Sequence, residues 1–313
     1  MIDRSVQTIL QPALVFLKQG DLEQAHKSLE RLLEQDLENP QVMYTLKGVS
    51  FWLDRIRYAQ TLSDNFLRGE YLISQWKPFL DYIGKMGDFN ELIVYALKCS
   101  IFTIALQLYQ SLLIGTEAVR NTAEIYRKTG LCYKALGDYE TAISCLQYAA
   151  DINAHSAAIL AELADAYSLS GETRLAKVFF REALFKNASE IEICFLDSEI
   201  FHALVTKVAA IGYKEEELLE WLPVYGTLDG VLNVKRELKA LELGKLKQSV
   251  YTLENELREK DIKSKKLIIP RLINYYFWLI DHYLNVNVEK SKIDEILLRI
   301  KLLDEKIYNR YIR

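Results

Sequence analysis

Two stretches of this chain repeat each other at a fixed offset. Residues 137–142 read GDYETA and residues 171–176 read GETRLA, so the glycine and the alanine both recur after 34 residues. A fixed period of this size indicates a repeat architecture, in which each unit is one supersecondary structure that buries its apolar face only by stacking on its neighbours. Because Gly and Pro, at 13 and 5 residues, are too scarce for a turn-rich β protein, the units are expected to be helical.

The two units that carry this offset place large and small apolar residues at helical spacing. In the unit 123–156 these are Tyr126, Gly130, Tyr133, Gly137, Tyr139, Ala142, Leu146 and Ala149. In the unit 157–190 they are Leu160, Leu163, Ala164, Tyr167, Gly171, Ala176, Phe180 and Ala183. Large residues at i, i+3, i+4 and i+7 interlock, small residues let two helices approach, and glycine ends the first helix in a left-handed turn. With its period of 34 residues, the pattern resembles the tetratricopeptide repeat (TPR), a helical hairpin.

Weaker versions of the same pattern cover the rest of the chain. Degenerate units are expected at 6–39, 40–85, 86–119, 191–225 and 228–260, with C-terminal capping helices at 268–313. The turn glycine is replaced by Arg55 in the second unit and by Ser100 in the third, whereas Gly244 lies at the expected bend of the last. We therefore expect residues 1–313 to form a single all-α domain, an α-α superhelix that is a TPR solenoid of stacked antiparallel helix hairpins.

The pattern also predicts individual elements beyond residue 190. Residues 191–210 are expected to form a first helix, and residues 213–221 a second helix that ends at Pro223. A loop is expected at 263–266, a helix from Pro270 to Leu284, and one long helix over 293–311. The aromatic stretch 275–280 belongs either to a central core helix or to a helix with one face available to a partner. In the second case the partner could be another copy of this chain, which would self-associate through the C-terminal helices.

Composition argues against several classes of protein. A formal net charge of -4 and a pI near 5.8 are unlike the basic excess typical of nucleic-acid binders, so no nucleic acid is expected as a partner. The four cysteines have no CxxC spacing and are expected to be reduced core residues. The most apolar stretches, 100–115 and 267–284, are interrupted by polar residues, so no transmembrane segment is expected.

The sequence carries no recognisable catalytic constellation. The four histidines are scattered without HxxxH or HExxH spacing, and phosphate-binding, nucleophile-elbow and kinase motifs are absent from the sequence. The acidic run 215–217 is interpreted as the first turn of a helix, and the basic cluster 260–266 as a solvated loop. No catalytic residue, cofactor or metal site is expected, and the protein is predicted not to be an enzyme.

The resemblance to TPR proteins implies a binding groove. In that family the first helix of each hairpin lines a concave surface that holds a segment of another protein. Carried onto this sequence, the groove-facing residues are Glu124, Arg127, Lys128, Leu131, Lys134, Ala158, Ala161, Glu162, Asp165, Ser168, Phe195, Glu199 and His202. Leu131 stands where a clamp for a C-terminal carboxylate would need Asn, so the expected partner is a protein or peptide segment of mixed charge with an apolar anchor.

A narrower resemblance concerns two other stretches. Residues 39–54 and 69–79 are similar to TPR proteins of spirochaetes, some of which build the collar around the periplasmic flagellar motor. The alternative to a general scaffold is therefore a structural subunit of a large assembly. The expected localisation is cytoplasmic because no secretory signal is visible; a periplasmic or membrane-associated assembly is the alternative if the chain is part of a longer protein.

Overall fold

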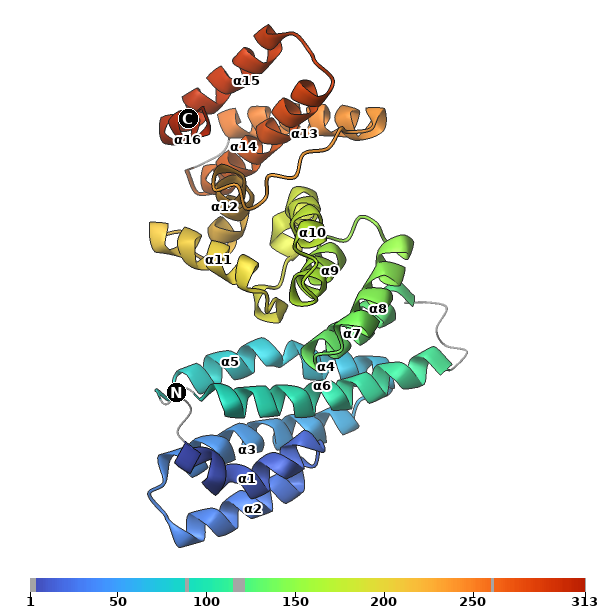
Figure 1. Ribbon diagram of the computed structural model, residues 1–313, viewed down its shortest axis with the longest axis vertical. Helices are drawn as coiled ribbons and strands as arrows, with labels where there is room; N and C mark the ends of the chain where they lie inside the picture. The colour runs from blue at the N-terminus through green and yellow to red at the C-terminus, as the bar shows by residue number, and fades with distance from the viewer. Residues whose placement is uncertain (1–3, 88–89, 115–121, 260–261, 313) are drawn as a thin grey trace. The chain divides into compact units, whose positions relative to one another are not determined.

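A computed structural model describes residues 4–87, 90–114, 122–259 and 262–312 (Figure 1). In these ranges the regular secondary structure is helical and no β-strand occurs, which confirms the all-α, TPR-like fold class. The chain divides into two compact units, Met1–Asn153 (unit 1) and Ala154–Arg313 (unit 2), and each is described by itself. A single domain over 1–313 remains a prediction.

Unit 1 is a series of helices that pack mainly on their neighbours in sequence. They are α1 (Arg4–Lys18), α2 (Leu22–Gln35), α3 (Pro40–Gln60), α4 (Asn65–Ser74), α5 (Trp76–Gly84), α6 (Glu91–Ile114), α7 (Thr122–Ala135) and α8 (Tyr139–Ile152). The pairs α1 and α2, α2 and α3, α6 and α7, and α7 and α8 are in contact. In addition α1 packs against α6, and α4 against α6, so these helices enclose a common core.

The predicted turns form where glycine precedes an aspartate. Gly20 and Gly137 adopt positive φ angles of 77° and 89°, a conformation that costs glycine little because it lacks a Cβ. The next residues, Asp21 and Asp138, each accept a hydrogen bond from a backbone amide in the first turn of the following helix, at 3.0 and 3.1 Å. The Gly-Asp pair thus ends one helix and starts the next.

Two turns expected in unit 1 are absent, because α3 continues through Arg55 and α6 continues through Ser100. Neither position offers a glycine for a left-handed turn. The Arg55 side chain instead bonds along its own helix to the Phe51 carbonyl at 3.0 Å. The Ser100 hydroxyl donates to the carbonyl of Ala96, one turn earlier in α6, and to that of Leu17 in α1. The described residues of the units predicted at 40–85 and 86–119 therefore do not form regular hairpins; residues 88–89 and 115–119 of the second unit lie outside the described ranges.

The helix α6 is the one helix in the described ranges that could cross a membrane by length and composition, over Glu91–Leu113. In unit 1 it packs against α1, α4 and α7, and 56% of its most apolar window is buried. A core helix has the same length and composition, so the apolar character of α6 is accounted for by its neighbours.

Unit 2 begins with a regular hairpin, and its longest helices follow later in the chain. Its elements are α9 (Ala157–Leu169), α10 (Thr173–Asn187), the 3-10 turns η2 (Ala188–Glu190) and η3 (Ile193–Phe195), α11 (Glu199–Ile211), α12 (Glu215–Leu228), α13 (Ala240–Glu259), α14 (Ile262–Asn285), α15 (Lys290–Leu303) and α16 (Glu305–Tyr311). Contacts join α9 to α10, α11 to α12, and α14 to α12, α13 and α15. The helix α14 is therefore the centre of the C-terminal part.

Several helix boundaries in unit 2 differ from the predictions. The first helix expected from residue 191 begins only at Glu199, after two 3-10 turns. The helices α12 and α14 run through Pro223 and Pro270, and α13 runs through Gly244. Both prolines are buried, so tertiary packing of these helices outweighs the backbone hydrogen bond that each proline removes.

The C-terminal region shows two further differences. Because α14 begins at Ile262, residues 263–266 are helical and not a loop. The single helix expected over 293–311 is split at Asp304, whose carboxylate caps the first amides of α16, those of Lys306 and Ile307.

The aromatic stretch of α14 lies in the core of unit 2. Tyr276, Phe277 and Trp278 are each at most 2% exposed, and the ring of Phe277 stacks on Tyr311 with centroids 4.5 Å apart. The core interpretation of this helix is confirmed. All four cysteines are free; Cys132 is buried, as expected of a core residue, whereas the other three are half-buried.

Candidate protein-binding surface

The hairpin of α7 and α8 is the most regular unit, and its close packing depends on one glycine. A Cβ on Gly130 would lie 2.7 Å from Leu146 Cγ and 3.1 Å from the Ala142 carbonyl oxygen, both in α8. On the same hairpin the rings of Tyr126 and Tyr148 have centroids 4.3 Å apart. Small and aromatic residues thus hold the positions that the repeat pattern gave them.

Three of the predicted groove residues on α7 join one ionic cluster in unit 1. Arg127 Nη1 donates to Glu124 Oε1 at 2.9 Å, and Lys128 Nζ lies 3.7 Å from the same oxygen. Lys128 Nζ is also 3.3 Å from Oε2 of Glu70 on α4, whose Oε1 accepts a hydrogen bond from the Tyr109 hydroxyl at 2.6 Å. Burial, followed by the charge of Glu70, raises the pKa of Tyr109 far above its ordinary value, so this hydroxyl stays a donor.

Most of the predicted residues on α7 are covered. Arg127, Lys128, Leu131 and Lys134 are between 1% and 8% exposed, whereas Glu124 is half-buried. Lys128 and Arg127 have carboxylate partners within unit 1, so their charges contribute to the internal structure of that unit. A substitution at these positions would alter folding as well as any surface.

In unit 2 the predicted residue Asp165 has a definite structural role. Its two carboxylate oxygens accept hydrogen bonds from the backbone amides of Asp197 and Ser198, both at 2.9 Å. Ser198 immediately precedes α11, so Asp165 on α9 fixes where that helix starts. Asp165 is fully buried, and Glu162 and Phe195 are 3% and 4% exposed.

Of the remaining predicted residues of unit 2, Ala158 and Ala161 are also buried, at 9% and 1% exposure, and three others are more accessible. Ser168 is half-buried near the end of α9, and Glu199 and His202 are exposed. Glu199 and His202 are three residues apart on the first turn of α11 and therefore share one face of that helix. They are the members of the predicted set that a partner could reach without a rearrangement of unit 2.

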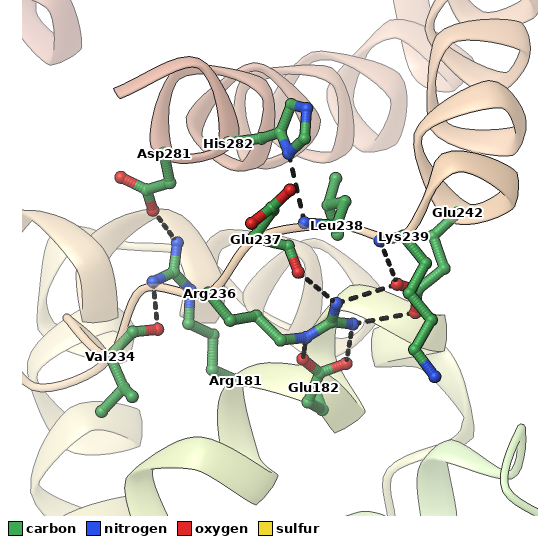
Figure 2. A network of polar contacts seen from close by, with 10 residues as sticks. All are labelled: Arg181, Glu182, Val234, Arg236, Glu237, Leu238, Lys239, Glu242, Asp281 and His282. Atoms are coloured by element: carbon green, nitrogen blue, oxygen red, sulfur yellow. Dashed lines mark hydrogen bonds and ion pairs between the residues drawn. The ribbon is translucent and has the colours of Figure 1, made fainter. Parts of the chain in front are cut away.

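A second polar cluster in unit 2 holds the segment 229–239, which connects α12 to α13 (Figure 2). Arg236 donates to Glu182 on α10 and to Glu242 on α13, with Nη2 3.1 Å from Glu182 Oε2 and Nη1 2.9 Å from Glu242 Oε2. The hydrogen bond from Arg236 lowers the pKa of Glu242 to about 2. Leu238 N donates to His282 Nδ1 on α14 at 3.2 Å.

A buried ion pair lies beside this segment. Arg181 on α10 donates to Asp281 on α14 and, through Nη1, to the Val234 carbonyl at 2.5 Å (Figure 2). The side chains of Arg181 and Asp281 are 4% and 3% exposed, and the Arg181 guanidinium carbon lies 4.6 Å from the centroid of the Trp278 ring. Sequence reasoning missed this pair. Asp281 interrupts an apolar stretch of α14, but Arg181 is one of several charged residues of α10, and the partners are 100 residues apart.

No group of three or more His, Cys, Asp or Glu side chains that could hold a metal ion occurs in the described ranges.

The comparisons with known proteins identify one repeat. Residues 123–155 match the family model for the tetratricopeptide repeat, and this range coincides with the hairpin of α7 and α8. No curated protein matches the chain. The family match supports the resemblance to TPR proteins, and repeats of this kind generally mediate contacts between proteins.

Proposed function

We propose that this protein is a non-enzymatic interaction scaffold that binds a segment of another protein on the first-helix faces of its hairpins. The observation that supports the proposal is the tetratricopeptide match at 123–155, on a hairpin whose glycine contact gives the close helix packing of that repeat. Hairpin arrays present such faces as extended binding surfaces.

The surface we propose for the partner includes the exposed face of α11. Glu199 and His202 offer a carboxylate and an imidazole there, and the buried Asp165 binds the backbone just before this helix. A partner segment with a basic side chain opposite Glu199 fits this face, because opposite charges at the rim of an interface favour association. Most of the other predicted groove residues are buried, whereas Glu124 and Ser168 are half-buried.

The experiment compares partner capture by the wild-type chain with that by the double variant Glu199→Lys, His202→Glu. The control is Glu216→Lys, which reverses an exposed charge on the first turn of α12. The affinity for the purified partner is measured by calorimetric titration. We expect the wild-type chain and the control to bind the partner with equal affinity, and the double variant to bind it at least about tenfold more weakly. Equal binding by all three proteins would place the partner on another surface.

A structural subunit of a large assembly, such as a flagellar motor collar, is the second candidate. The observation that favours it is the exposure of apolar side chains on α15, where Leu298 and Leu302 are 56% and 79% exposed. A subunit of this kind should self-associate, and Leu302→Lys should reduce the mass measured by light scattering at high concentration. A wild-type chain that is monomeric at all concentrations would refute self-association through α15.

A further inference from the structure

A cavity of about 320 Å³ in unit 2 is lined by three cationic side chains. It lies among α10, α12, α14, α16 and the connecting segment 229–239. Arg181, Lys235 and Arg310 line it, with Asp281 as the carboxylate among its described lining residues. We call this the Arg181 cavity.

The carboxylates around the Arg181 cavity are fewer than the cations they pair with. Asp281 is shared by Arg181 and by Lys235, whose Nζ lies 3.1 Å from Oδ1. Asp229 is shared by Arg310 and by Lys207, whose Nζ lies 2.7 Å from Oδ2. Four cations therefore face two carboxylates, both of which are almost fully buried, and two positive charges are left over. Such an excess attracts an anion.

The neighbouring ionic cluster does not neutralise this excess. Arg236 forms ion pairs with Glu182 and Glu242, and the charge of Lys186 also lowers the pKa of Glu242. The two cations of that cluster are therefore balanced by two carboxylates. None of these four side chains lines the Arg181 cavity.

Arg181 itself retains an unused donor. Its side chain is 4% exposed, and its Nε is buried without a hydrogen-bond partner in the described part of the chain. Buried donors are nearly always paired, so this unpaired Nε is an exception, and it belongs to a residue that lines the cavity. Lys235 and Arg310 are 47% and 41% exposed, so both side chains can turn toward a ligand. Asp281 would then stay paired with Arg181, and Asp229 with Lys207.

Neutral polar groups complete the wall. Thr227, Asn233 and Tyr311 line the cavity, and the Tyr311 ring is fixed by its stacking on Phe277. Burial, followed by the charge of Asp281, raises the pKa of Tyr311 above its ordinary value, so its hydroxyl stays protonated and able to donate. The Thr227 hydroxyl donates to the Pro223 carbonyl at 2.9 Å, and its oxygen remains an acceptor for a ligand hydroxyl.

We propose that the Arg181 cavity binds a small organic dianion, either a phosphate monoester or a dicarboxylate. Guanidinium groups suit both oxyanions because their planar donors match carboxylate and phosphate geometry. The volume is at the lower end of the range for small-molecule sites. This site is separate from the proposed partner surface on α11, so either proposal can fail without the other.

The test is calorimetric titration of the full chain with glycerol 3-phosphate, with succinate, and with acetate as a monoanion, all at constant ionic strength. The variants are Lys235→Gln and Arg310→Gln. The control is Lys301→Gln, which removes a cation that is also 47% exposed and paired with a carboxylate, but does not line the cavity. Thermal melting of each variant verifies that it folds.

We expect saturable binding of at least one dianion, with acetate binding much more weakly. Each cavity variant should weaken binding by about tenfold or more, the usual effect of losing one charge-assisted hydrogen bond, and Lys301→Gln should leave it unchanged. Preference for glycerol 3-phosphate or for succinate identifies the ligand as a phosphate ester or a dicarboxylate. Absence of saturable binding of both dianions, or equal weakening by all three variants, would overturn the proposal.

Discussion

Replacement of Gly130 by alanine tests whether the α7–α8 hairpin depends on close helix contact. The new Cβ would lie 2.7 Å from Leu146 Cγ and 3.1 Å from the Ala142 carbonyl oxygen. Leu146 is fully buried and the second neighbour is backbone, so neither can move away at low cost. Overpacking of this kind costs about 1–3 kcal/mol.

The same substitution has a favourable component that must be subtracted. Alanine is better than glycine in a helix interior by about 0.8–1 kcal/mol, and Gly130 lies within α7. Gly130→Ala is therefore expected to lower the free energy of unfolding by about 1 kcal/mol, and by about 2 kcal/mol at most.

Gly244 provides the matched control. It lies within α13, is exposed, and a Cβ added there meets no atom within 4 Å. Only the helix-propensity gain remains, so Gly244→Ala should stabilise α13 by about 0.8–1 kcal/mol. One chemical change is thus expected to have opposite signs at two helical glycines.

Native-state hydrogen exchange measures the two effects where they occur. We expect amides of α7 and α8 to exchange about fivefold faster in Gly130→Ala, and amides of α13 to exchange more slowly in Gly244→Ala. A Gly130→Ala protein in which α7 and α8 are as protected as in the wild type, while Gly244→Ala behaves as expected, would show that the contact is not needed for packing.

Three further outcomes follow from the polar groups of unit 2. Asp165→Asn should increase amide exchange at the start of α11, because the buried carboxylate that accepts from the amides of Asp197 and Ser198, just before this helix, is replaced at a cost of about 1–3 kcal/mol. Because Arg236 lowers the pKa of Glu242 to about 2, the stability that ionised Glu242 contributes is present above the ordinary glutamate pKa and is lost as pH falls toward 2. The melting temperatures of wild type and Glu242→Gln should therefore differ at pH 7 and converge at low pH. Asp281→Ala should destabilise unit 2 by about 3–5 kcal/mol in urea unfolding, whereas Arg181→Met combined with Asp281→Leu should cost less because no unpaired charge stays buried.

The sequence predicts the fold class and the regular hairpins because their determinants are local. Gly137 and Gly171 end helices at positive φ angles of 89° and 90°, and both turns are where the repeat places them. Where the glycine is missing, as at Arg55 and Ser100, the pattern alone cannot show whether the chain turns, and in both cases the helix continues. Glycine at position 244 is compatible with a bend, but a Cβ placed there would meet no atom within 4 Å, so no contact favours a bend over a straight helix.

The candidate surface was less predictable than the fold. The repeat pattern identifies the first helix of each hairpin but not which of its polar residues are exposed, since Arg127 and Asp165 are buried by partners that the pattern does not specify. The Arg181–Asp281 pair joins residues 100 positions apart, and no local spacing can predict that contact. Long-range polar contacts of this kind require the tertiary structure.

The contact between α1 and α6 affects how unit 1 folds. In an ideal solenoid each repeat touches only its neighbours, so folding can start in any repeat and spread. Here the Ser100 hydroxyl in α6 donates to the Leu17 carbonyl in α1, across 83 residues, and the two helices pack together. This long loop must close before α1 is stabilised by α6, which slows folding relative to a purely local array and couples α1 to α6. Unit 1 should therefore fold and unfold as one cooperative block over these helices, and removal of α1 should destabilise α6 as well as α2.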